Sequence, residues 1–259
     1  MTLHYASDLH LEFPENRQWL LRNPLQGEGG VLVLAGDVMP FGQLGKHKDL
    51  LQRWSEQYEH VLWIPGNHEY YGGDIGQRSG PLDEQLDSGV RLVNDTAVYV
   101  QGVRILCTTL WSPIAQLNEM AIQRAVNDYH QIRHGHALLH PAHITRLHQA
   151  SLQWLKRQLA QPFAGPTVVA THHVPTLMHY PPQYLGSSIN EAFAVELHDL
   201  IADSGATAWI YGHHHRNIAP YTIGRTRMLT NQLGYVRLGE EVGFDPNRTI
   251  KLELLTDKQ

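Results

Sequence analysis

Residues that can ligate metal ions follow five hydrophobic runs of the sequence. The runs read as buried strands at residues 3–7, 31–35, 61–64, 167–171 and 207–211. The segments that end them are Asp8-Leu9-His10, Gly36-Asp37, Gly66-Asn67-His68-Glu69, Thr171-His172-His173 and Gly212-His213-His214-His215. Ligands placed just after strands of an open α/β sheet converge on one edge of that sheet. Carboxylates, an amide and imidazoles gathered there predict a centre that holds two metal ions.

The spacing within two segments suggests which side chains act together. In an extended backbone, residues i and i+2 point to the same side. Asp8 and His10 are therefore expected to face one metal ion while Leu9 turns into the core. The same spacing pairs His213 with His215 and turns the histidine between them away.

Glycine precedes the ligand in three of the segments. Gly36 is expected to let the backbone turn sharply and bring the Asp37 carboxylate close to the metal ions. Gly66 and Gly212 are expected to serve their own segments in the same way. Asn67 adds a neutral amide oxygen, which suits a mixed oxygen and nitrogen site.

Each segment by itself has an ordinary structural explanation. Gly-Asp and Gly-Asn are common turn signals, and His-His followed by Val-Pro also fits a strand end. The histidine run at 213–215 lies well inside the chain, so it is not an expression tag. The joint occurrence of the segments after five strand-like runs favours the metal centre.

Taken together, the five segments resemble the signature of calcineurin-like metallophosphoesterases. The resemblance spans residues 8–215 of the 259. It implies a four-layer α/β/β/α sandwich of two mixed sheets, with helices outside and a dinuclear metal site at the strand ends. Residues 1–259 are expected to form a single domain of this kind, with a helical insertion around residues 112–140.

The resemblance also implies a role for each ligand. Asp37 is expected to bridge, because two divalent cations about 3.5–4 Å apart share ligands. One ion is expected on Asp8, His10 and His215, and the other on Asn67, His172 and His213. The oxygen and imidazole ligands suit manganese, iron or zinc, and a hydroxide between the ions is expected to attack phosphorus.

Two further histidines have expected roles outside the ligand set. His68 is expected to stabilise the transition state or to protonate the leaving oxygen, and with Asn67 to contact the substrate. His173 could also contact the substrate. Its side chain should point away from that of His172, however, which favours packing.

The sequence departs from phosphoprotein phosphatases of the superfamily, which carry an Asp and an Arg shortly after the Gly-Asp motif. Here Asp37 is followed by Val38-Met39-Pro40-Phe41-Gly42. His68 therefore lacks its usual partner, and a phosphate dianion lacks its arginine clamp. This favours a small, nucleotide-like phosphodiester substrate. A phosphomonoesterase, including a phosphoprotein phosphatase, and a non-catalytic scaffold remain alternatives.

Composition limits the partners. Net charge is −5 and no Lys/Arg cluster stands out, so no extended nucleic-acid surface is expected and the expected partner is a small phosphate ester. No apolar run is long enough to span a membrane, and no signal peptide is recognisable. The single Cys107 excludes an internal disulfide, which fits a cytoplasmic protein.

The remaining elements follow from periodicity and turn signals. Helices are expected at 17–22, 47–58, 82–87, 141–159 and 190–202. Strands are expected at 91–94, 97–101, 103–108, 218–223, 227–230 and 249–254, and a flexible loop at 72–80. Six histidines between residues 130 and 148 are read as a polar helical face or loop, although a second metal site is conceivable.

Overall fold

Two six-stranded mixed sheets form the centre of the computed structural model, which describes residues 1–27, 29–86 and 88–253. The first sheet has the order β14 (Thr249–Lys251), β1 (Thr2–Ala6), β2 (Val31–Ala35), β3 (His60–Ile64), β5 (Arg91–Asn94), β4 (Leu82–Gln85). The second has the order β12 (Tyr221–Ile223), β13 (Thr226–Leu229), β11 (Ala208–Ile210), β10 (Thr167–Thr171), β7 (Val103–Thr108), β6 (Thr96–Val100). In each sheet the inner strands pair in parallel and both edge strands are antiparallel.

The main core lies between the two sheets. Val33 and Ile64 of the first sheet share one buried cluster with Ile105 and Val168 of the second. Every residue of β2, β7 and β10 is buried. Continuous burial of this kind is expected of parallel strands that are covered on both faces, and it explains the unbroken hydrophobic runs of the sequence.

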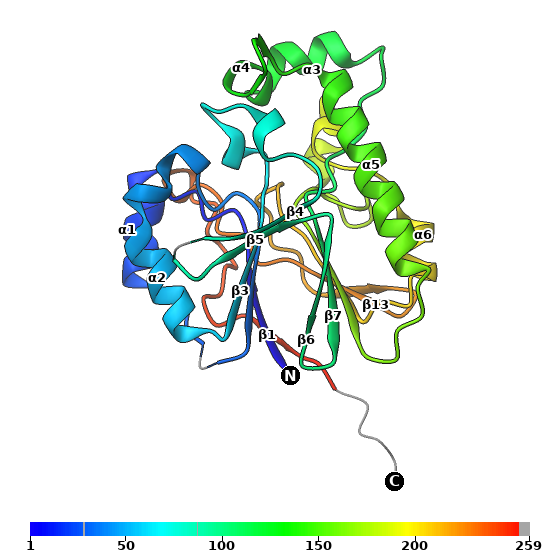
Figure 1. The fold of residues 1–259 in the computed structure, drawn as a ribbon. Helices are drawn as coiled ribbons and strands as arrows, with labels where there is room; N and C mark the ends of the chain where they lie inside the picture. The colour runs from blue at the N-terminus through cyan, green and yellow to red at the C-terminus, as the bar shows by residue number, and fades with distance from the viewer. Residues whose placement is uncertain (28, 87, 254–259) are drawn as a thin grey trace.

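Helices cover the outer face of each sheet (Figure 1). On the first sheet lie α1 (Pro14–Arg22) and α2 (Lys48–Gln57), which bury Leu20, Leu51 and Trp54. On the second lie α5 (Pro141–Leu159) and α6 (His198–Asp203), which bury Leu155 and Ile201. The predicted four-layer α/β/β/α sandwich is therefore confirmed. Among the described residues, no helix is both long and apolar enough to cross a membrane.

Residues 112–140 lie beyond the ends of the sheets, opposite the N-terminus (Figure 1). They contain α3 (Glu119–Ala125), α4 (Asp128–Gln131) and a hairpin of β8 (Arg133–His134) and β9 (Ala137–Leu138). A separate buried cluster joins Ile122 and Tyr129 of this region to Tyr70 and Trp111. The region is thus packed against the loops that follow the strands. Short 3₁₀ segments complete the described chain: η1 (Phe41–Lys46), η2 (His68–Tyr70), η3 (Ile75–Gln77), η4 (Pro182–Tyr184), η5 (Asn190–Ala192) and η6 (Val236–Leu238).

Most predicted elements occur with ends shifted by at most a few residues, and β2, β5, β7, β10 and α5 match their predicted ranges. The helix predicted at 17–22 begins earlier, because Pro14 is well suited to the first helical turn. The end of the strand predicted at 249–254 lies outside the described residues. The loop predicted at 72–80 contains η3, whose first turn is capped by the Asp74 side chain.

The helix predicted at 82–87 is wrong. Residues 82–85 form β4, which pairs antiparallel with β5, and residue 87 lies outside the described residues. The exposure of these residues alternates along the strand, as a sheet edge requires. Asp83 accepts two hydrogen bonds of 2.7 Å from Arg91 across the pair. A run this short does not distinguish helix from strand until its pairing partner is known.

The single helix predicted at 190–202 is also wrong. Only η5 and α6 are helical there, and the chain between them is irregular. Ala194 forms a parallel bridge with Val174, and the Val195 N–H donates to the Val174 carbonyl at 3.0 Å. This long-range pairing replaces the local hydrogen bonds that a continuous helix would make.

The reactivity of the Cys107 thiol tests whether the core lies between the sheets. Its thiol is fully buried, and burial raises the thiol pKa to about 12. We therefore expect no reaction with Ellman's reagent in the folded protein and one thiol per chain after unfolding in guanidinium. Rapid reaction of the folded protein would contradict this packing.

Candidate metal centre

Four imidazoles at the strand ends each use one ring nitrogen, the outward one, to bond to a protein oxygen. The other nitrogen, the inward one, faces a second histidine of the set: His10 faces His215, and His172 faces His213. The outward bonds are His10 Nδ1 to Glu12 Oε1 at 3.1 Å, His172 Nδ1 to the Ala35 carbonyl at 3.0 Å, His213 Nε2 to the Ala192 carbonyl at 3.3 Å, and His215 Nδ1 to Glu240 Oε2 at 2.7 Å. A carbonyl or carboxylate oxygen can only accept a hydrogen bond, so the outward nitrogen of each ring is the donor and carries the hydrogen. In the neutral ring the inward nitrogen then keeps a lone pair, which is the arrangement found around metal-bound histidines.

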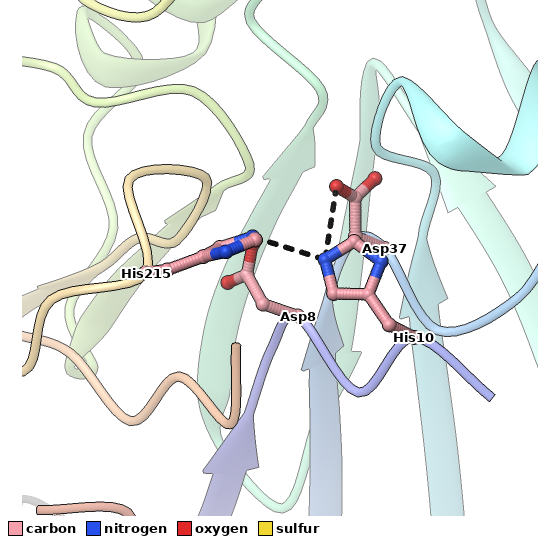
Figure 2. Close-up of side chains that lie close together, drawn as sticks. All are labelled: Asp8, His10, Asp37 and His215. Carbon is pink, nitrogen blue, oxygen red and sulfur yellow. Dashed lines mark hydrogen bonds and ion pairs between the residues drawn. The ribbon is translucent and has the colours of Figure 1, made fainter. Parts of the chain in front are cut away.

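One group of inward-facing atoms comes from Asp8, His10, Asp37 and His215, all within 4.8 Å of one another. His10 Nε2 lies 3.0 Å from His215 Nε2 and 3.8 Å from Asp37 Oδ2. His215 Nε2 lies 3.4 Å from Asp8 Oδ1. Figure 2 shows these side chains pointing toward one another from the loops beyond the strands.

A second group contains Asp37, His172 and His213, again within 4.8 Å. His172 Nε2 lies 3.1 Å from His213 Nδ1, 3.1 Å from Asn67 Oδ1 and 3.4 Å from Asp37 Oδ1. The two oxygens of Asp37 thus face different groups, Oδ1 toward His172 and Oδ2 toward His10. This carboxylate stands between two clusters, which is the position that a bridging ligand needs.

The backbone brings these residues together differently from the prediction. Asp8, His10, His213 and His215 have φ values of 56°, 47°, 78° and 50°, so neither segment is extended. Asp37 also has a positive φ, of 54°. Asp and His are among the few side chains that enter this left-handed region with any frequency, and such residues cluster at functional sites. The expected convergence occurs, but alternation along a strand is not its cause.

The three glycines provide space for the ligands. A Cβ on Gly36 would overlap the His172 ring, and a Cβ on Gly66 would overlap the Asp37 carboxylate. A Cβ on Gly212 would come within 2.5 Å of Asp8 Oδ2. Of the three, only Gly36 has a positive φ, so at Gly66 and Gly212 the close approach of neighbouring side chains is the reason for glycine.

The electrostatics of the cluster reflect paired charges in a buried space. Burial opposes the charged forms, yet the hydrogen bond and charge of His215 hold the pKa of Asp8 at about 2. Burial likewise acts to lower the pKa of His172, but Asp37 raises it to about 9. Burial also opposes a charged His215, and its bonds to Asp8 and Glu240 raise that pKa to about 10. His213 is dominated by burial, and its pKa falls to about 3. Strong carboxylate–imidazole coupling of this kind is typical of sites that bind cations.

His68 has a carboxylate partner that the sequence analysis missed. Its Nδ1 lies 2.8 Å from Glu12 Oε1, the same oxygen that bonds His10. Burial acts against a charged His68, but Asp37 and Glu12 raise its pKa. Its Nε2 faces the Tyr235 hydroxyl at 3.3 Å. Glu12 therefore orients His68 and favours its protonated form. The only sequence signal for Glu12 is its place two residues beyond His10.

Glu69 joins the Gly36-Asp37 loop to the Gly66-Asn67 loop. Its buried carboxylate accepts the backbone N–H groups of Asp37, Val38 and Gly66 at 3.0, 2.7 and 2.6 Å. It also accepts the Trp63 indole N–H at 3.0 Å. Glu69 thus faces the backbone rather than His68, and it holds two ligand-bearing loops in register.

Asp128, at the start of α4, orients Asn67. The Asp128 carboxylate, only 4% exposed, accepts the Asn67 side-chain N–H at 2.8 Å. This leaves the Asn67 Oδ1 directed at the ligand cluster. The same Asp128 oxygen accepts the Tyr71 hydroxyl at 2.8 Å, and the Tyr71 ring stacks on His68 with centroids 4.0 Å apart. Asp128 lies in the helical insertion expected around residues 112–140, and no motif marks it.

The other histidines lie outside the ligand groups. His173 is buried against His213 and Trp111, with ring centroids 4.2 and 5.0 Å away. His214 turns toward the Gln232 side chain, as expected. In the 130–148 stretch, His148 bonds the Leu110 carbonyl. Among the described residues, all convergent groups that could hold a cation lie at the strand-end cluster.

A cavity of about 340 Å³ opens beside the cluster. Its lining includes Asp37, Asn67, His68, His213 and His215 of the cluster. Residues 125–128 and several residues of the 180–193 segment also line it. Tyr71, Tyr235 and Glu240 also line it, whereas His173 does not. Two ligand groups and His68 therefore share one opening.

The family model for calcineurin-like phosphoesterases matches residues 1–217. The chain belongs to this family. It is therefore a metallophosphoesterase, a metal-dependent hydrolase, and the resemblance seen in the sequence is confirmed.

Similar proteins cover nearly the whole chain. Uncharacterized protein L509 of Acanthamoeba polyphaga mimivirus is 28% identical over 284 residues, covering 98% of this chain and 97% of the viral protein. Phosphopantetheinyl hydrolase of Mycobacterium tuberculosis has the same fold, with a TM-score of 0.71, 18% identity, and coverage of 96% of this chain and 95% of that one. A dimetal phosphatase of Danio rerio gives a TM-score of 0.43 at 13% identity over 90% of this chain and 87% of that one.

Replacing Asp128 tests how this metallophosphoesterase orients Asn67. In Asp128→Leu the Asn67 amide loses the acceptor that fixes it, so we expect metal affinity at one of two sites to fall about 10- to 100-fold. Isothermal titration with Mn²⁺ and metal analysis would measure the change. Tyr71→Phe is the matched control, because it keeps Asp128 and removes one donor. Unchanged affinity at both sites in a folded Asp128→Leu protein would contradict this role.

Proposed function

We propose that this metallophosphoesterase hydrolyses small phosphodiesters with two divalent cations at the strand-end cluster. The observation that carries the diester preference is the charge of the cavity. Among the residues that the structure describes, no Lys or Arg lines it. A monoester dianion is usually recognised by a bidentate arginine, whereas a diester carries one charge less.

The residues fit a pair of cations. Asp8, His10 and His215 would hold one, Asn67, His172 and His213 the other, and Asp37 would bridge them. The support is the set of inward lone pairs, fixed by outward hydrogen bonds, and the space that the three glycines leave. Nitrogen and oxygen donors without thiolate suit manganese, iron or zinc. When bound, two such cations supply Lewis acidity and lower the pKa of water.

His68 is the proposed proton donor to the leaving oxygen. It is almost buried, its Nδ1 is held by Glu12, and its Nε2 is directed toward the cavity beside Tyr235. The raised pKa of His68 keeps a proton available on the ring. Glu12 supplies the orienting carboxylate that phosphoprotein phosphatases place after the Gly-Asp motif. Asn67 and His68 also line the cavity, where they would contact the substrate.

An arginine in the cavity would favour a monoesterase, but the arginines near the site do not line it. Arg216, next to the ligand His215, is exposed and does not line the cavity. Arg124 and Arg133 of the 112–140 region are also absent from the lining. Tyr235 offers a neutral hydroxyl instead, which suits a singly charged phosphate group.

The proposed partner is a small substrate rather than a polymer. Net charge is −5, and the cavity volume suits one small molecule. Cys107 as the only cysteine is compatible with the proposed cytoplasmic location.

Paired chromogenic substrates test the proposal. Purified protein reconstituted with Mn²⁺ is assayed on bis(p-nitrophenyl) phosphate and on p-nitrophenyl phosphate, with and without chelator. We expect faster turnover of the diester, abolished by chelation. Faster turnover of the monoester would overturn the diester assignment. No turnover of either by protein that binds no metal would favour the scaffold.

Two substitutions separate chemistry from metal binding. His68→Ala should keep both cations and lose at least about 100-fold in turnover, because a general acid contributes about 10²–10⁴-fold. Asp37→Ala should lose metal as well as activity, because the shared ligand is removed. Metal content and kcat measured on the same preparations distinguish the two. Full activity of His68→Ala would remove this residue from the mechanism.

A further inference from the structure

Resting on the proposed phosphodiesterase function, we propose that the cavity selects diesters in which one esterified group is uncharged and carries a flat ring, as a nucleoside carries its base. The cavity walls, rather than the metal ligands, would make this selection. Two properties of the walls carry the proposal: their aromatic rings and the sign of their charges.

The aromatic rings of the cavity are held in place by the cluster itself. Tyr71 stacks on His68 with an interplanar angle of 24°, and Phe193 stacks on His213 with ring centroids 5.0 Å apart. Tyr180 packs parallel to His214 at 17°. Tyr184, which is half-buried, adds a further ring to the lining. Rings already fixed by packing lose little conformational freedom when a flat group binds, and every base offers a π-face to stack on them.

The charges of the lining disfavour a second phosphate. Besides the candidate ligand Asp37, the carboxylates of Asp128 and Glu240 line the cavity, and no Lys or Arg of the described chain lies there with them. The remaining polar lining groups include Asn127, Ser187 and Asn190, whose amides and hydroxyl are neutral. Such groups can bond to the edge of a base or to a sugar hydroxyl. A substrate with an additional phosphate would bring unpaired negative charge against two carboxylates.

These walls come from two segments that approach the cluster from different parts of the chain. Residues 125–128 belong to the region above the sheets, and residues 180–193 lie in the connection between β10 and α6. Asp128 links the first wall to the cluster through Asn67 and Tyr71. Wall and ligands are therefore fixed relative to each other, so a stacked group sits at a defined distance from His68.

Three diesters with the same leaving group test the inference. They are methyl p-nitrophenyl phosphate, thymidine 5′-(p-nitrophenyl phosphate), and the latter carrying a 3′-phosphate. In each, a water oxygen bonds to phosphorus and the phosphorus–oxygen bond to p-nitrophenol breaks, so differences report the remaining group. We expect the thymidine ester to have a KM at least about 10-fold below that of the methyl ester. We expect the 3′-phosphate to raise KM about 10-fold above that of the thymidine ester without it.

Substituting a ring of the cavity wall tests whether that wall causes the KM difference. Tyr184→Ala should shrink the KM difference between the thymidine and methyl esters. Tyr99→Ala should keep it, because Tyr99 is an exposed ring on β6 that does not line the cavity. Equal KM values for the methyl and thymidine esters, or a lower KM with the 3′-phosphate, would overturn the inference and leave the phosphodiesterase intact. No turnover of any diester by the metal-loaded protein would instead sink the proposed function.

Discussion

The site depends on the outward hydrogen bonds of four histidines. Each bond fixes the proton on one ring nitrogen and turns the other toward the cluster. The acceptors come from distant parts of the chain: Ala35 ends β2, Ala192 ends η5, Glu12 precedes α1 and Glu240 follows η6. The sandwich of two sheets brings these acceptors and the strand-end ligands to one edge. Packing of the core between the sheets therefore determines the direction of the lone pairs.

The candidate ligands could be recognised in the sequence because each lies a few residues beyond a buried strand. Their convergence needs only the topology of parallel strands, which the hydrophobic runs indicate. Glu12, Asp128 and Glu240 could not be found in this way, since each bonds to a candidate ligand through a contact made only after folding. The left-handed backbone at Asp8 and His10 was equally hidden. Sequence patterns thus located the side chains that converge at the strand ends but missed the carboxylates that orient them.

The two wrong elements have the same physical origin. Residues 82–85 form a strand because β5 offers an edge to pair with, and residues 193–197 are not helical because Val174 pairs with Ala194. In both segments a long-range partner outweighs local preference. The second segment matters for the site, because Phe193 lines the cavity and the neighbouring Ala192 carbonyl bonds to His213.

Anomalous diffraction from crystals soaked in Mn²⁺ tests the two-cation account most directly. The account predicts two peaks about 3.5–4 Å apart on either side of Asp37. One should lie beside Asp8, His10 and His215, and the other beside Asn67, His172 and His213. A single peak, or peaks away from Asp37, would contradict it.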